Sequence, residues 1–368
     1  MKPLELNIVV IGLSITSSWG NGHATTYRCL LRGLAQRGHR ILFLERDVPW
    51  YAKNRDLSHV PYANVKLYCG LDELRDTYRD AIRQADLVII GSFVPDGAKI
   101  SHWMLEEAKG VTAFYDIDTP VTLEKVEAGN CEYLTRELIP RYNLYLSFTG
   151  GPALAELERV YGARLARPLY CAVDPDDYFP EEKTPRWDLA FMGTYSVDRQ
   201  ASLHRLLIST AKQAPELKFA VAGSMYPADI EWPKNVNRIE HLAPGDHRHF
   251  YNSQTYALNL TRIQMIRAGY SPSVRIFEAA ACGTPILSDF WPGLDEFFVP
   301  GKEILVVRST DQVLRALQEI PEEQRRTIAE KARITTLAHH TGEIRSRQLE
   351  EYYLSALPRV ARPLSLIS

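Results

Sequence analysis

The sequence predicts an α/β protein in which two Rossmann-like domains face each other across a cleft. Short apolar runs alternate with longer amphipathic segments, and this rhythm is interrupted and then restarts near the middle of the chain. The length of 368 residues also exceeds what one hydrophobic core usually organises. We therefore expect one domain over residues 1–175, a second over residues 176–340 and a helical tail over residues 341–368.

The first half contains a series of apolar runs that are typical of buried parallel strands. These runs are continuous rather than alternating, as expected when helices cover both faces of a sheet. A segment with helical spacing, residues 25–37, follows the first run and ends at Gly38. The predicted strands are residues 6–12, 40–44, 86–91, 112–115 and 144–148.

The second half repeats the pattern after residues 173–187, where proline and acidic residues indicate a linker between the domains. Helices are expected at residues 200–213, 274–281 and 310–319, and the charged segment 322–357 is expected to be helical throughout. The predicted strands are residues 188–192, 218–222, 237–241, 256–260, 285–287 and 304–307.

The composition excludes several classes of protein. A formal net charge of −2 provides no global field for binding nucleic acid or an anionic membrane. The 5 cysteines are scattered and form no CxxC pair, which argues against a zinc site or a disulfide framework and fits the cytoplasm. The apolar run in residues 1–14 is too short to span a bilayer and lacks a signal-peptide cleavage pattern, so a buried first strand is expected there.

The most informative segment is residues 271–289, SPSVRIFEAAACGTPILSD. The helix is expected to start at Ser273 and Val274, where free backbone N–H groups and the positive helix end suit a diphosphate. Arg275 adds a cation for phosphate oxygens, and the carboxylate of Glu278 can accept hydrogen bonds from a ribose diol. Gly283 should end this helix before the next strand.

This segment resembles the donor domain of GT-B glycosyltransferases, whose E-A-x-A-C-G-x-P pattern is found here at residues 278–285. The pattern around Arg275 is most similar to the CgeB-like, spore-maturation subgroup. The resemblance implies a hexosyltransferase-like enzyme without a cofactor or metal ion, whose donor substrate is a UDP or TDP sugar and whose acceptor is a small molecule or glycan. It also implies that the C-terminal helix crosses back onto the first domain. Many retaining members carry a glutamate where this chain has Tyr270, so the resemblance leaves the stereochemistry open.

Two further segments match the same donor domain. Residues 191–199, FMGTYSVDR, place Gly193 after a strand and Arg199 at the head of the next helix, where relatives put a basic residue for phosphate. Arg262 ends the strand at residues 256–260 and faces the same crevice if the sheet is parallel. We expect all three residues to contribute to donor binding.

The loop after the first strand contains Gly20 and Gly22, which permit close approach of a ligand to the backbone. In GT-B relatives this loop lies in the cleft, so His23 could act as the general base or cap the first helix. The GNGH sequence is not the dinucleotide fingerprint, and Glu45 is the only acidic residue that could close the next strand in the manner of NAD-binding proteins.

Asp116 and Asp118, in YDIDTPVT, follow a predicted strand and would share a face of an extended chain. Either carboxylate could serve as the acceptor base in place of His23. Asp118 could instead cap the segment that begins at Pro120.

Three other functions remain compatible with the sequence. A nucleotide-sugar 2-epimerase shares the fold and donor site, and a structural or spore-coat-type protein could retain a degenerate site. A Rossmann dehydrogenase is the third alternative.

Overall fold

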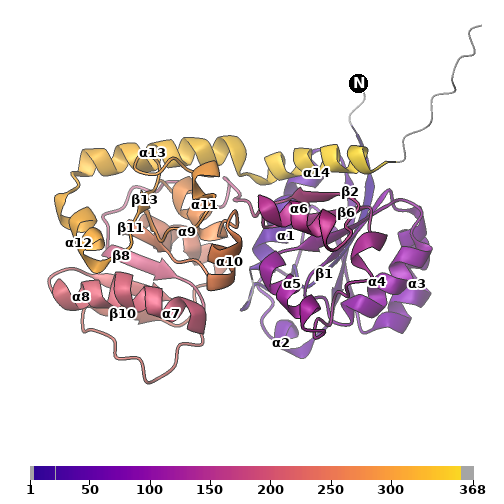
Figure 1. Ribbon diagram of the computed structural model, residues 1–368, viewed down its shortest axis with the longest axis horizontal. Coiled ribbons are helices and arrows are strands. Elements are labelled where there is room, and N and C mark those ends of the chain that lie inside the picture. The colour runs from indigo at the N-terminus through magenta and orange to yellow at the C-terminus, as the bar shows by residue number, and fades with distance from the viewer. Residues whose placement is uncertain (1–3, 21, 358–368) are drawn as a thin grey trace, which may run out of the picture.

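Two parallel β-sheets form the framework of the protein, which is described by a computed structural model covering residues 4–20 and 22–357. The first sheet has 7 strands and the second has 6, and each belongs to its own half of the chain. Figure 1 shows the two halves side by side, with the C-terminal helices running along one edge of both. The predicted α/β architecture with two Rossmann-like domains is confirmed.

The first sheet is parallel and has the strand order β3-β2-β1-β4-β5-β6-β7, so the direction in which successive strands are added to the sheet reverses between β1 and β4. Its central strands are buried apolar runs, and helices lie on both of its faces. The elements of this domain are β1 (Asn7–Gly12), α1 (His23–Gln36), β2 (Arg40–Arg46), α2 (Pro49–Ala52), β3 (Asn64–Tyr68), α3 (Leu71–Gln84), β4 (Leu87–Gly91), α4 (Gly97–Glu107), β5 (Val111–Asp116), α5 (Thr119–Glu127), η1 (Ile139–Arg141), β6 (Leu144–Ser147), α6 (Pro152–Arg159) and β7 (Ala166–Pro168).

The second sheet has the order β10-β9-β8-β11-β12-β13, with the corresponding reversal between β8 and β11. In open sheets of this kind, ligands bind at the carboxyl ends of the strands beside the reversal. The elements are β8 (Trp187–Met192), α7 (Val197–Leu203), the π-helical turn η2 (His204–Ile208), α8 (Ser209–Gln213), β9 (Phe219–Ala222), β10 (Val236–Ile239), α9 (Pro244–Asn252), β11 (Gln254–Asn259), α10 (Ile263–Ala268), α11 (Val274–Ala281), β12 (Ile286–Ser288), η3 (Leu294–Glu296), β13 (Leu305–Val306) and α12 (Thr310–Glu319).

Two consecutive helices, α13 (Glu322–His339) and α14 (Gly342–Ala356), carry the chain back to the first domain. Helix α14 packs on α1 at a glycine pair: a Cβ on Gly33 would lie 2.6 Å from the carbonyl oxygen of Gly342, so only glycine permits this separation. The Ser346 hydroxyl then donates to the Leu30 carbonyl at 3.3 Å. The predicted crossing of the C-terminal helix is therefore observed, and residues 358–368 of the predicted tail lie outside the described residues.

A buried arginine fixes the point where the chain passes between the domains. Arg345 is 2% exposed, and its guanidinium donates to the carbonyl oxygens of Tyr170 and His339 at 3.0 and 2.9 Å. It also contacts Nδ1 of His340 at 2.8 Å. Because these partners come from the interdomain segment and the turn between α13 and α14, Arg345 holds the two crossing segments together.

The structure corrects one predicted element and adds others. The single helix expected over residues 200–213 is interrupted by the π-helical turn η2. Strand β3 and helices α3 to α6 were not predicted, because β3 is mostly exposed and α3 is highly charged. Within the described residues, no helix is long and apolar enough to cross a membrane.

Candidate active site

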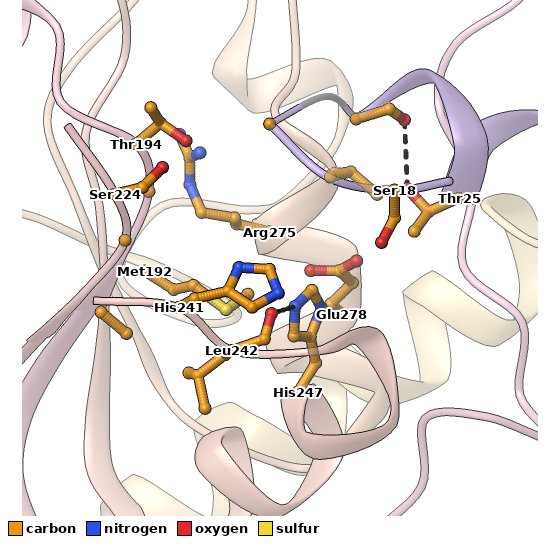
Figure 2. Close-up of a pocket in the computed structure, with 16 residues that line it drawn as sticks. Ser18, Thr25, Met192, Thr194, Ser224, His241, Leu242, His247, Arg275 and Glu278 are labelled. Carbon is orange, nitrogen blue, oxygen red and sulfur yellow. Dashed lines mark hydrogen bonds between the residues drawn. The ribbon is translucent and has the colours of Figure 1, made fainter. Parts of the chain in front are cut away.

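A cleft between the two domains lies at the carboxyl ends of both sheets. One part of it, lined mainly by the second domain, is here called the donor crevice. Figure 2 shows the side chains of Arg275 and Glu278 in this crevice, between the loop that bears Ser18 and the strand ends that bear Thr194 and Ser224. The lining residues are Ser18, Gly20, Gly22, Thr25, Met192, Gly193, Thr194, Ala222, Gly223, Ser224, His241, Leu242, His247, Val274, Arg275 and Glu278.

A neighbouring part of the cleft, here called the transfer pocket, shares Gly22, Val274 and Arg275 with the donor crevice. It contains His23 and Asp118 from the first domain, and Arg199, Arg262 and Ser273 from the second. The fold thus brings residues from segments far apart in the sequence to one interdomain space.

Helix α11 supplies the central groups of the donor crevice. Ser273 is its N-cap residue, and the hydroxyl of Ser273 accepts a hydrogen bond from the Arg275 backbone N–H at 3.4 Å. Gly283 follows the helix with a φ of +70°, a conformation that glycine adopts without strain. The helix spans Val274–Ala281, so its predicted bounds are confirmed.

Glu278 is buried at 3% exposure but reaches the wall of the crevice. Tyr251, on α9, donates its hydroxyl to Oε2 of Glu278 at 2.9 Å. Burial and the Glu278 charge raise the pKa of both Tyr251 and Tyr178 well above the ordinary value, so both phenols remain protonated. Tyr251 therefore fixes the Glu278 carboxylate from the protein side. The carboxylate oxygens can accept further hydrogen bonds from a ligand.

Arg199 and Arg275 lie close together, and Asp118 and Asp198 oppose the charge of Arg199 only from beyond ion-pair distance. Their guanidinium groups donate to the backbone carbonyls of Thr194 and Leu260 at 2.6 and 3.0 Å. Among the described residues neither arginine forms an ion pair, and the Nε atoms of both are buried without a hydrogen-bond partner. Burial and the charge of Arg275 lower the pKa of Arg199 to about 10. An anion bound between them would satisfy these donors and relieve the repulsion.

Gly193 lies at the end of β8 and lines the crevice. Its N–H donates to the Ala222 carbonyl at 2.8 Å, and its carbonyl accepts from the Tyr226 hydroxyl at 3.0 Å. A Cβ at Gly193 would lie 2.8 Å from the Phe191 ring, so a larger residue would disturb the floor beneath Arg275.

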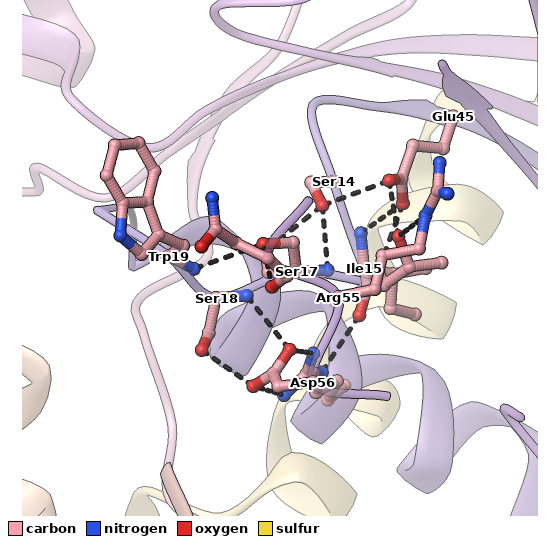
Figure 3. Close-up of polar contacts among 11 residues, drawn as sticks. Ser14, Ile15, Ser17, Ser18, Trp19, Glu45, Arg55 and Asp56 are labelled. Atoms are coloured by element: carbon pink, nitrogen blue, oxygen red, sulfur yellow. Dashed lines mark hydrogen bonds and ion pairs between the residues drawn. The ribbon is translucent and has the colours of Figure 1, made fainter. Parts of the chain in front are cut away.

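The loop between β1 and α1 is anchored by polar contacts to Glu45 and Asp56, as Figure 3 shows. Glu45 is fully buried, and its carboxylate accepts from the backbone N–H groups of Ile15 and Thr16 at 2.7 and 3.0 Å, and from the Thr16 hydroxyl at 2.6 Å. Asp56 accepts from the N–H and hydroxyl of Ser18 at 3.1 and 2.7 Å. Since the Glu45 carboxylate, at the end of β2, is occupied by hydrogen bonds from the loop between β1 and α1, it is not available to a dinucleotide ribose. This argues against the dehydrogenase alternative.

The two aspartates of the YDIDT segment do not share a face. Strand β5 ends at Asp116, and Asp118 is the N-cap residue of α5, so the alternation expected for an extended chain ends between them. Asp116 is fully buried and accepts from the hydroxyls of Tyr145 and Thr122 at 2.6 and 2.7 Å, and its burial raises its pKa to about 6. The expectation that Asp116 could act as acceptor base is corrected, because its carboxylate is engaged in the core.

Asp118 lines the transfer pocket, with a side chain 28% exposed. Burial raises its pKa, against the opposing charges of Arg262, Arg199 and Lys125. A raised pKa makes this carboxylate a stronger base than an ordinary aspartate. Its side chain makes no N-cap hydrogen bond in α5, so the alternative capping role is not observed.

His23 is the first residue of α1 and also lines the transfer pocket. Its ring is 7% exposed and packs edge-on against Phe93, with 5.4 Å between the ring centroids. Burial lowers the pKa of His23 to about 4, so the imidazole is neutral and weakly basic at neutral pH. This favours Asp118 over His23 as a proton acceptor.

The depressed pKa of His23 predicts a loss of stability in mild acid. Between pH 6.5 and 4 the unfolded chain binds a proton that the folded protein does not, so the free energy of unfolding falls as the pH is lowered. We expect about 2 kcal/mol of this loss between pH 7 and pH 5, and His23→Gln should remove it. Urea unfolding at both pH values measures the difference. His59→Gln, at an exposed histidine, is the control, and an equal effect of both variants would contradict the assignment.

Several lining residues were not predicted from the sequence, among them three with polar side chains from the second domain. Ser224 and His241 follow β9 and β10, and His247 lies on α9, where its Nε2 faces the Leu242 carbonyl at 3.3 Å. Their positions at or just after the ends of predicted strands could have indicated Ser224 and His241, because loops that follow parallel strands line the ligand crevice. No group of three or more metal-ligating side chains occurs among the described residues.

The class of fold is that of GT-B glycosyltransferases, with two Rossmann-like domains and a C-terminal helix that crosses between them. Residues 199–351 match a family model described as "Glycosyl transferase-like". No curated protein matches the chain significantly.

Solved structures confirm this fold class. Sucrose-phosphate synthase from Thermosynechococcus elongatus has 13% identity and a TM-score of 0.69, covering 95% of this chain and 98% of its own. Anabaena HepE in complex with UDP-glucose has 15% identity and a TM-score of 0.69, covering 96% and 100%. The catalytic domain of starch synthase IV from Arabidopsis thaliana, bound to ADP and acarbose, has 12% identity and a TM-score of 0.67, covering 96% and 99%.

Proposed function

We propose that this protein is a glycosyltransferase that takes a sugar from a nucleoside diphosphate donor held in the donor crevice. The observation that carries the proposal is the pair Arg199 and Arg275, two cations without a carboxylate partner among the described residues, at the N-terminus of α11. The match of residues 199–351 to the glycosyltransferase family model, and the UDP-glucose and ADP complexes of similar folds, support the same class of ligand.

The crevice suggests how the donor would lie. The ribose diol would donate to Glu278, and the diphosphate would lie against Arg199, Arg275 and the backbone N–H groups after Ser273. The sugar would then extend into the transfer pocket toward Asp118. We propose UDP or TDP as the nucleotide, and membership of the CgeB-like subgroup, on the motif around Arg275.

The proposed reaction is transfer of the glycosyl group to an acceptor hydroxyl. The bond from the anomeric carbon to the diphosphate oxygen breaks, the acceptor oxygen forms the new glycosidic bond, and Asp118 takes the hydroxyl proton. Arg199, Arg275 and the positive end of α11 stabilise the departing diphosphate by fixed charge, the role that a metal ion has in other transferases. Closure of the two domains would exclude water.

The other proposed properties follow from the same features. The acceptor would be a small molecule or glycan that enters the transfer pocket between the two domains and presents a hydroxyl to Asp118. A hexose donor is proposed by analogy with UDP-glucose in HepE. The free cysteines Cys29, Cys69, Cys131, Cys171 and Cys282 fit a reducing compartment, and we propose the cytoplasm.

A thermal-shift panel of nucleoside diphosphates and nucleotide sugars tests the function. We expect a nucleoside diphosphate to raise the unfolding temperature, with about 2.7 kcal/mol of stabilisation at 100 times its Kd, and NAD to have no effect. The stabilising nucleotide sugar is then incubated with and without candidate acceptors. Conversion of the sugar without an acceptor would identify an epimerase instead, and no stabilisation by any nucleotide would favour a structural protein.

A further inference from the structure

Arg262 lies in a different electrostatic environment from the other two arginines of the cleft. It follows β11 as the N-cap residue of α10, and its guanidinium lies between two carboxylates. Its Nη1 is 3.5 Å from Oδ2 of Asp118 in the first domain, and its Nε is 3.5 Å from Oδ2 of Asp198 in the second. The charge of Arg262 is therefore opposed by two carboxylates within ion-pair distance, one of them in the opposite domain, and its Nε, like those of Arg199 and Arg275, is buried without a hydrogen-bond partner among the described residues.

This balance makes Arg262 a poor ligand for a diphosphate. Among the described residues, the guanidinium groups of Arg199 and Arg275 donate to backbone carbonyls and form no ion pair, so an anion there would meet two cations that no carboxylate contacts directly. An anion that approached Arg262 would be repelled by the two aspartates beside it. The donor-binding role expected for Arg262 from the sequence therefore gains no support from a free cation available to phosphate.

Asp198 is itself fixed, which gives Arg262 a rigid base. The Ser196 hydroxyl donates to Oδ1 of Asp198, and the Ile263 backbone N–H donates to Oδ2 at 3.1 Å. The side chain of Asp198 is 15% exposed. Because Asp198 directly precedes Arg199 in the first turn of α7, these contacts join the helix start that carries a proposed phosphate ligand to Asp118 across the cleft.

We infer that Arg262 is a positioning residue that holds Asp118 toward the transfer pocket and couples closure of the first domain to the N-terminus of α7, rather than a ligand of the donor phosphates. Its effect on the rate of transfer rests on the proposed function. Its independence from phosphate binding and its bridging of the domains do not.

The first test measures binding of inorganic pyrophosphate by calorimetry at low salt, a probe that needs no knowledge of the base or sugar. Arg262→Gln should bind pyrophosphate within about twofold of the unmodified protein, whereas Arg199→Gln should bind it at least about tenfold more weakly, the loss expected for one charge-assisted contact. An equal loss in both variants would overturn the inference.

The second test measures the bridge between the domains by small-angle scattering. Arg262→Gln and Asp118→Asn should each increase the radius of gyration without ligand, and the double variant should increase it no further, because both remove the same contact. Arg262→Lys should retain part of the compact form. An increase in the double variant equal to the sum of the two single increases would contradict a shared contact.

With a transferase activity in hand, Arg262→Gln should lower kcat without changing the KM for the donor, and the loss should not add to that of Asp118→Asn. A raised donor KM with unchanged kcat would assign Arg262 to the donor instead. If the unmodified protein transfers no sugar to any acceptor, the proposed function fails, while the pyrophosphate and scattering results still decide the role of Arg262.

Discussion

Replacing Glu278 with alanine should weaken binding of the nucleoside diphosphate by about 10- to 150-fold, corresponding to about 1.5–3 kcal/mol for hydrogen bonds to a charged group. Among the described residues that line the donor crevice, Glu278 is the one acidic residue, and the Tyr251 hydroxyl donates to its carboxylate from the protein side at 2.9 Å. A ribose diol could donate to the remaining acceptor sites, and alanine provides none of them.

A modified nucleotide shows whether the lost affinity comes from the ribose. The unmodified protein should bind UDP or ADP more tightly than the corresponding 2′,3′-dideoxynucleotide by the same factor that Glu278→Ala costs. Glu278→Ala should bind both forms of the nucleotide equally. If the variant still distinguishes them, another group contacts the diol.

Tyr251→Phe separates binding from stability. Glu278→Ala leaves the buried Tyr251 hydroxyl without this acceptor, which costs about 1–3 kcal/mol of folding stability. Tyr251→Phe removes the same hydrogen bond but keeps the carboxylate, so it should retain most of the nucleotide affinity. Equal losses of affinity in both variants would mean that the alanine effect is structural.

The framework could be predicted from the sequence because its signals are local. Continuous apolar runs give the central strands of both sheets, and the small residues of α11, closed by Gly283, define that helix at both ends. Strand β3 lacks such a run, since most of its residues are exposed at the edge of the sheet. Edge strands of this kind carry little apolar signal.

The donor-binding residues could also be predicted because their signal is local in the sequence. The contacts between the domains could not be predicted. Ser273, Arg275 and Glu278 lie on one short helix, so their spacing implies their common direction. Whether a group is balanced depends on partners distant in the sequence: Arg262 meets Asp118 only after both domains have folded and come together. The burial of a side chain also depends on segments distant in the sequence. For this reason the sequence did not distinguish His23 and Asp116 from Asp118 as possible bases.

Replacing Arg199 with methionine should abolish most of the stabilisation by nucleotide without lowering the stability of the free protein. In the folded protein, burial and the charge of Arg275 lower the pKa of Arg199 to about 10. The side chain is still charged at neutral pH, so this charge lowers the free energy of unfolding. After allowance for partial solvent exposure, this cost is about 1–2 kcal/mol. Methionine removes this cost, together with the cation–π contact of the guanidinium with the Phe191 ring and its hydrogen bond to the Thr194 carbonyl. The unbranched apolar side chain of methionine can pack against the same ring, so we expect the gain to be at least as large as the loss.

The measurement compares unfolding temperatures with and without a saturating nucleoside diphosphate. Arg199→Met should unfold at the same or a higher temperature than the unmodified protein when free, and should gain little from the ligand. Arg326→Met, at a helix surface position where the side chain is 80% exposed and paired with Glu322, should leave the ligand-induced shift unchanged. A strongly destabilised Arg199→Met protein would mean that this guanidinium supports the fold. A retained ligand shift would mean that the diphosphate lies elsewhere, since a repulsive pair of buried cations persists only where an anion offsets its cost.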